Sequence, residues 1–189
     1  MLNQSPFGWM LNAPAFENLI HEMLMDKKVD LQLYKMKRTK GSINSVFTGH
    51  INSPSDAVRA QSLFRRPKQR KPIDAPPLRR NKWTKEFELR TYYVPKDRRN
   101  SLWDGLLIGK VFQNVTIFQS TLSPKKTATS SADKFLTTID KDVKVVYVYV
   151  HPDSLSSDIK LYLPPVYTQL IDDRVYRLPV TKDLIDRFI

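Results

Sequence analysis

The side chains best suited to binding phosphate are concentrated in one stretch of the sequence. Residues 65–85 contain nine Lys and Arg residues and one acidic residue, Asp74, so this stretch carries +8 of the net charge of +12. Each cation placed against a phosphate releases a condensed counterion, which makes such binding strongly dependent on salt. Arginine can also hold a phosphate with two donors and stack on bases. The pattern therefore predicts a polyanion partner for this stretch.

The predicted nucleic-acid-binding residues are the cations of this stretch, one tryptophan within it, and a second cluster in the sequence VPKDRRN. They are Arg65, Arg66, Lys68, Arg70, Lys71, Arg79, Arg80, Lys82, Trp83, Lys85, Lys96, Arg98 and Arg99. Phe64 and Trp83 flank most of the run, and Tyr92 and Tyr93 follow it. Proteins that bind single strands use aromatic side chains beside cations to stack on bases.

Three alternatives for the basic stretch are an anionic membrane surface, a solvated flexible linker and a nuclear localisation signal. Its four prolines, Pro67, Pro72, Pro76 and Pro77, remove backbone donors and preclude a continuous helix. This disfavours the amphipathic helix with which many proteins bind a membrane surface. The prolines favour an extended arm, which suits a chain lying along phosphates.

A short motif near the C-terminus suggests a different partner. Pro164, Pro165, Val166 and Tyr167 match the P-P-x-Y pattern that WW domains bind as a preformed polyproline helix. The motif is similar to the budding motifs of enveloped-virus matrix proteins. The structural alternative is that the prolines end the preceding strand and Tyr167 packs in the core.

Residue types that could support catalysis are sparse. The three histidines, His21, His50 and His151, stand alone in the sequence, and there is no cysteine. The sequence GLLIGK at 105–110 has three residues between its glycines where a phosphate-binding loop has four, and Val111 follows where Ser or Thr would hold magnesium. We therefore expect a protein that is not an enzyme and has no cofactor or metal.

Hydrophobic periodicity predicts an α+β, mainly β fold. A helix is expected over 13–26, with one apolar face and with His21 off that face, and a short helix capped by Thr181 closes the chain. The segment 142–150 is apolar on both faces, as a doubly buried strand would be. We divide the chain into an N-terminal helix and strand (1–36), an extended basic proline-rich linker or arm (37–85) and an antiparallel β-rich domain with a short C-terminal helix (86–189).

These observations predict a structural protein that binds nucleic acid, RNA in preference to DNA, or a ribonucleoprotein through a basic extended arm. A viral matrix, coat or nucleocapsid-associated protein is the leading hypothesis, and self-association is consistent with it. The alternatives are an organellar ribosomal protein, or a peripheral membrane or adaptor protein that binds anionic lipid and a WW-domain partner. No apolar run is long enough for a transmembrane helix, and we see no secretory signal. We therefore expect a cytoplasmic, nuclear or virion location.

Overall fold

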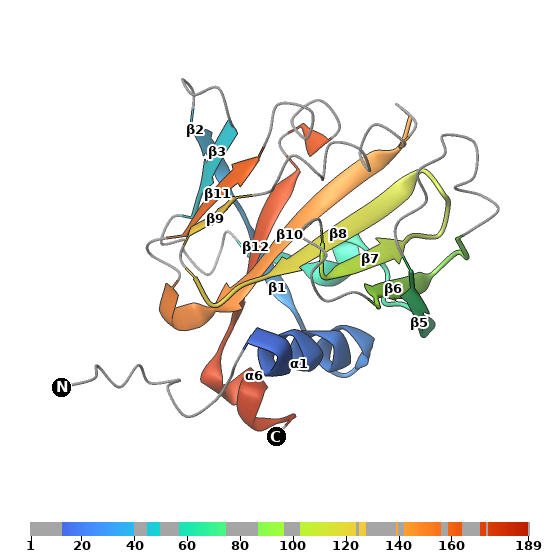
Figure 1. Ribbon diagram of the computed structural model, residues 1–189, viewed down its shortest axis with the longest axis horizontal. Helices are drawn as coiled ribbons and strands as arrows, with labels where there is room; N and C mark the ends of the chain where they lie inside the picture. Colours follow the sequence, from blue (N-terminus) through green and yellow to red (C-terminus); the bar gives the residue numbers. More distant parts are fainter. Residues whose placement is uncertain are drawn as a thin grey trace.

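A central eight-stranded sheet separates two layers of the molecule (Figure 1). Helices cover one of its faces, and a four-stranded sheet packs against part of the other. The computed structural model describes residues 13–39, 45–49, 57–74, 87–96, 103–123, 125–127, 139, 142–155, 159–163, 171–172 and 174–188, with the backbone alone for 125–127. None of the helices in these ranges is long and apolar enough to span a membrane.

The strand orders of the two sheets bring together distant parts of the chain. The large sheet runs β4 (Ala57–Arg59), β1 (Gln32–Lys35), β12 (Val175–Val180), β10 (Lys144–Pro152), β8 (Asn114–Ser120), β7 (Gly105–Ile108), β6 (Thr91–Pro95) and β5 (Gln69–Ile73). The second sheet runs β2 (Lys37–Thr39), β3 (Ser45–Thr48), β11 (Lys160–Leu163) and β9 (Lys125–Thr127). The helical elements are α1 (Ala13–Met25), α2 (Ala60–Leu63), the 3-10 turn η2 (Asp153–Leu155) and α6 (Lys182–Asp186).

Strand β10 is the centre of the fold, and its apolar sequence explains why. Val145 and Tyr147 point into the core shared with the second sheet, whereas Val148 and Val150 point into the core under α1 and α6. β10 pairs in parallel with β8 on one side and β12 on the other. A strand between parallel neighbours with both faces covered has to be apolar throughout, so the predicted doubly buried strand is confirmed.

The prediction of an antiparallel sheet is wrong, because the sheet is mixed. Besides the parallel pairs of β10, strand β5 runs parallel to β6, while β7 is antiparallel to both of its neighbours, β6 and β8. The same sheet takes β1 from the predicted N-terminal segment, β4 and β5 from the predicted linker, and the remaining strands from the predicted β-rich domain. The prolines therefore do not keep 69–73 out of the sheet, since an edge strand tolerates a residue without a backbone donor.

The two end helices form where the sequence predicts them. Helix α1 buries its apolar stripe, which includes Phe16, Ile20 and Met23. Thr181 caps α6, because its side-chain oxygen accepts a hydrogen bond from the Leu184 backbone amide. His21 departs from prediction: it is buried, and its Nδ1 lies 2.8 Å from the hydroxyl of Tyr92 on β6. This hydrogen bond allows a polar ring to lie in the core.

Two local features help to set where strands of the large sheet begin and end. Arg90 has φ 56°, a left-handed conformation that interrupts extended chain, and β6 begins directly after it at Thr91. Gly109 lies in the tight turn between β7 and β8, where its amide donates to the carbonyl of Asn114 at 2.7 Å.

Candidate nucleic-acid interface

The described part of the basic stretch starts in the core and ends at the edge of the large sheet. Phe64 is buried edge-on against Phe118, with 5.3 Å between ring centroids, and Pro67 is buried as well. Arg65 lies between these two buried residues in the sequence, and Lys68 follows Pro67. Both cations are exposed. The chain then continues into β5. Just before this strand, the amide of Lys68 donates to the carbonyl of Arg90 at 2.8 Å. The first half of the stretch is therefore fixed to the sheet.

Arg66 is directed inward and caps the C-terminal end of α1. Its Nη1 donates to the carbonyls of Met23 and Leu24 at 3.0 and 3.1 Å, and its Nη2 donates to the carbonyl of Val29. Carbonyls in the last turn of a helix have no partner within the helix, and they carry its negative dipole end. Burial lowers the pKa of Arg66, and Asp26 and Asp30 oppose that shift. The geometry gives Arg66 a structural role in place of the predicted phosphate contact.

The cations on β5 face carboxylates from neighbouring elements. Arg70 pairs with Glu22 of α1 at 3.0 Å, and Lys71 pairs with Glu88, which also accepts a hydrogen bond from the side chain of Gln69 at 2.6 Å. The hydrogen bond between Lys71 and Glu88 raises the pKa of the lysine and lowers that of the glutamate. These pairs lie at the surface, where solvent and salt screen the attraction and an ion pair contributes little to stability. A phosphate could therefore replace either carboxylate at small cost.

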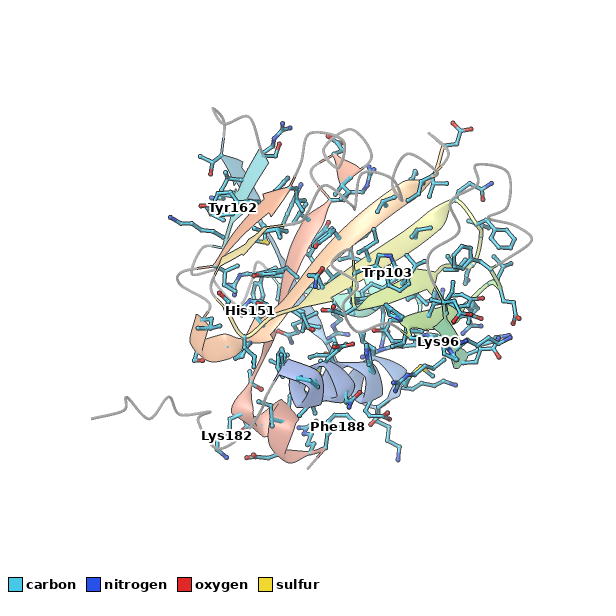
Figure 2. The ribbon with its side chains drawn as sticks, viewed as in Figure 1. Lys96, Trp103, His151, Tyr162, Lys182 and Phe188 are labelled. Carbon is cyan, nitrogen blue, oxygen red and sulfur yellow. The ribbon has the colours of Figure 1, made fainter. Side chains whose placement is uncertain are left out.

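Lys96, which was predicted as part of a second basic cluster, lies at the end of β5 beside Asp74. Its backbone amide donates to the carbonyl of Ile73 at 2.8 Å, and its ammonium pairs with Asp74 at 2.9 Å. The parallel pairing of β5 with β6 produces this contact, since Ile73 lies opposite Pro95 at the end of both strands. Figure 2 shows Lys96 at the β5 and β6 end of the molecule.

Two lysines that the sequence did not single out belong to this region. Lys27 and Lys28 are exposed in the turn that joins Leu24 to Val29, the residues on either side of it whose carbonyls Arg66 binds. They lie more than 35 positions before Arg66 (Val29 and Arg66 are separated by 37). No sequence pattern around Lys27 and Lys28, or around Arg66, could indicate that these two parts of the chain lie together, because their proximity depends on how α1 packs on the sheet.

The remaining predicted residues lie outside the described part of the chain. They are Arg79, Arg80, Lys82, Trp83, Lys85, Arg98 and Arg99, together with the whole of the P-P-x-Y motif, Pro164, Pro165, Val166 and Tyr167. Of the described cations in the basic stretch, Arg65 and Lys68 have no ion pair. These two define the exposed, unpaired part of the candidate interface.

The aromatic residues around the stretch do not serve it as stacking surfaces. Phe64, Tyr92 and Tyr93 are all buried in the cores of the large sheet. Burial also raises the pKa of Tyr92 well above its usual range. The expectation that these three rings lie beside the cations for base stacking is therefore corrected, and Trp83 is outside the described residues. The described part of the candidate interface therefore provides positive charge, and these three rings are not available for base stacking.

Compared with known proteins, the chain matches no family model, no curated protein and no solved structure.

Proposed function

We propose that this protein is a non-enzymatic structural protein that binds nucleic acid, or a ribonucleoprotein, through its basic stretch. The observation that carries the proposal is the concentration of charge, +8 of +12 in residues 65–85. The fold supports it by holding the start of the stretch on the sheet, while Arg65 and Lys68 are exposed and form no ion pair within the described part of the chain. A role as a viral matrix, coat or nucleocapsid-associated protein would use such a surface.

The structure decides which cations a test should remove. Arg66 supports α1, so its loss would weaken binding by disturbing the fold. Arg70, Lys71 and Lys96 have carboxylate partners, so their loss would also release negative charge at the surface. The informative variant therefore replaces Arg65, Lys68, Arg79 and Arg80 by Ala and keeps Arg66.

We expect this fourfold variant to bind labelled RNA more weakly and with a flatter dependence on salt. The slope of log K against log salt should fall by about 0.7 for each single-strand phosphate contact that is lost. Fluorescence anisotropy titrations over a range of KCl concentrations measure the slope. A matched control replaces by Ala four exposed cations elsewhere that form no ion pair among the described residues: Arg59, Lys110, Lys144 and Arg187.

The control variant loses the same charge but should keep most of the slope. An unchanged slope in the test variant, or an equal fall in both variants, would contradict the assignment of binding to this stretch. Failure of the wild-type protein to bind RNA or DNA at low salt would overturn the proposed function itself.

A further inference from the structure

The outer face of the second sheet is a second basic surface, at the other end of the molecule from β5 (Figure 1). On β3 and β11, Phe47 and Leu161 point into the core, and the alternate residues are exposed or half-buried. Side chains alternate between the faces of a strand. The outer sheet face therefore consists of Lys37, Thr39, Val46, Thr48, Lys160 and Tyr162 in the part of the sheet with described side chains.

The register places its cations in one row across the strands. Lys37 on β2 lies opposite Thr48 on β3, and Thr48 lies opposite Lys160 on β11. The backbone of Lys125 on β9 takes the next place, opposite Lys160. Since neighbouring strands are about 4.8 Å apart, Lys37 and Lys160 stand roughly 10 Å apart across β3. The row presents positive charge at a spacing set by the rigid sheet.

This face differs from the β5 surface because its described lysines have no carboxylate partners among the described residues. The four strands have the sequences KRT, SVFT, KLYL and KKT, which contain lysine and arginine but no acidic residue. Within the described ranges, Lys37 and Lys160 are exposed and form no ion pair. A surface with charge of one sign attracts a polyanion at long range.

An aromatic side chain lies among these cations. Tyr162 is two residues after Lys160 on β11, so both side chains are on the outer sheet face, roughly 7 Å apart along the strand. Its ring is half-buried, flanked across the strands by Val46, and Figure 2 shows it on the second sheet. Base stacking on a sheet aromatic beside a cation is how several sheet folds bind single strands.

We propose that the outer sheet face binds single-stranded nucleic acid, with Lys37 and Lys160 on phosphates and Tyr162 stacked on a base. The inference rests on the proposed function, and it adds a second contact region and a preference for single strands. A membrane fits this face less well. The large apolar residues that are exposed in the described chain, Leu89, Val111 and Leu122, all lie outside the second sheet.

The test compares an oligouridine longer than about 16 nucleotides, the upper site size of one single-strand-binding fold, with a duplex of equal length. We expect the variant Lys37→Gln/Lys160→Gln to lower the salt slope for oligouridine by about 1.4, two contacts of about 0.7 each. Tyr162→Ala should weaken oligouridine binding roughly 5- to 150-fold with little change in slope, and Tyr162→Phe should bind like wild type. Lys144→Gln at the start of β10 is the control for loss of an exposed lysine that forms no ion pair among the described residues.

The outcomes separate this inference from the proposed function. If the basic-stretch variant loses affinity while Lys37→Gln/Lys160→Gln and Tyr162→Ala bind oligouridine like wild type, the outer sheet face is not a binding surface and the proposed function stands. Equal losses for oligouridine and duplex in Tyr162→Ala would overturn the preference for single strands. If vesicles of anionic lipid bind the wild type and the lysine variant abolishes only that binding, the ligand is a membrane. Conservative Lys37→Arg/Lys160→Arg should retain binding, which shows that any loss follows from charge.

Discussion

At the scale of single residues, the same side-chain type serves two roles in adjacent positions. Arg65 faces solvent, whereas Arg66 turns inward and binds three backbone carbonyls at and after the end of α1. The difference comes from the chain itself, because Phe64 and Pro67 are buried on either side and fix which side chain faces the helix. The positive charge at position 66 therefore stabilises the fold, whereas the positive charge at position 65 is exposed to solvent.

We predict that Arg66→Ala lowers the free energy of unfolding by roughly 2–3 kcal/mol. Hydrogen bonds that involve a charged group each contribute about 1.5–3 kcal/mol, and the loss leaves carbonyls near the helix end without this donor. Urea denaturation followed by circular dichroism measures the change. Arg65→Ala should stay within about 0.5 kcal/mol of wild type, as for other exposed sites. Equal effects of the two substitutions would show that Arg66 does not support α1.

A second residue-scale prediction concerns His151, which is fully buried near the end of β10 (Figure 2). Its Nδ1 donates to the carbonyl of Pro152 at 2.8 Å. Burial lowers the pKa of His151 to about 4, and the charge of Arg177 adds to the shift. The unfolded chain, in which histidine has a pKa of about 6.5, therefore binds a proton before the folded chain does.

The free energy of unfolding should consequently fall as the pH drops from about 6.5 to about 4. Above pH 6.5, His151 should cause no such loss. The pKa difference corresponds to roughly 3 kcal/mol across that window. Urea denaturation at pH 7 and at pH 4.5 should show a smaller loss in His151→Gln than in wild type. The wild type and His151→Gln share all other titrating groups. An equal loss of unfolding free energy in the two proteins would therefore contradict the prediction.

At the scale of elements, strands and helices with a strong local pattern were predictable from the sequence. The apolar stripe of α1, the cap at Thr181 and the doubly apolar β10 all form as expected. The pairing was not predictable, because β5 and β6 are brought together by long-range contacts and a run of prolines and cations does not look like a strand. The candidate site follows the same division: its charge could be counted in the sequence, but the inward turn of Arg66 and the carboxylates facing Arg70 and Lys71 depend on packing.

The close pairing of β6 with β7 leads to another prediction at the scale of elements. A Cβ added at Gly105 would lie 2.0 Å from the Tyr92 hydroxyl oxygen and 2.4 Å from its Cζ. Gly105→Ala should therefore destabilise the protein by roughly 1–3 kcal/mol or more through overpacking. Combined with Tyr92→Ala, it should add less than its separate effect, because the clashing ring is gone. Additive changes in unfolding free energy would show that the two residues do not constrain each other.

At the scale of the whole molecule, one sheet draws on nearly the full length of the described chain. Strand β1 ends at Lys35, and β2 begins at Lys37 in the second sheet, so the chain passes between the sheets at the buried Met36. Helix α1 covers Phe118 and Val150, which belong to strands of the C-terminal half. The sheets therefore share their cores with segments from both ends of the sequence.

We predict that a fragment of residues 86–189 does not fold by itself. It lacks α1, β1, β4 and β5, so Tyr92, Phe118 and Val150 would lose the apolar side chains that cover them. The fragment should show no cooperative urea transition by near-ultraviolet circular dichroism. The full chain should unfold in one transition, coincident by circular dichroism and by tryptophan fluorescence, to which the buried Trp103 contributes (Figure 2). Cooperative unfolding of the fragment would instead make the C-terminal half a domain of its own.

The position of β5 has a consequence for how copies of the protein behave in concentrated solution. β5 is the last strand of the large sheet, so in the described part of the chain one side of its backbone has no neighbouring strand. An open edge of this kind is a template for aggregation by strand addition. Pro72 lacks a backbone donor, and Arg70 and Lys71 bring like charges together when two edges approach. The composition of this strand therefore favours solubility whichever partner the charge meets.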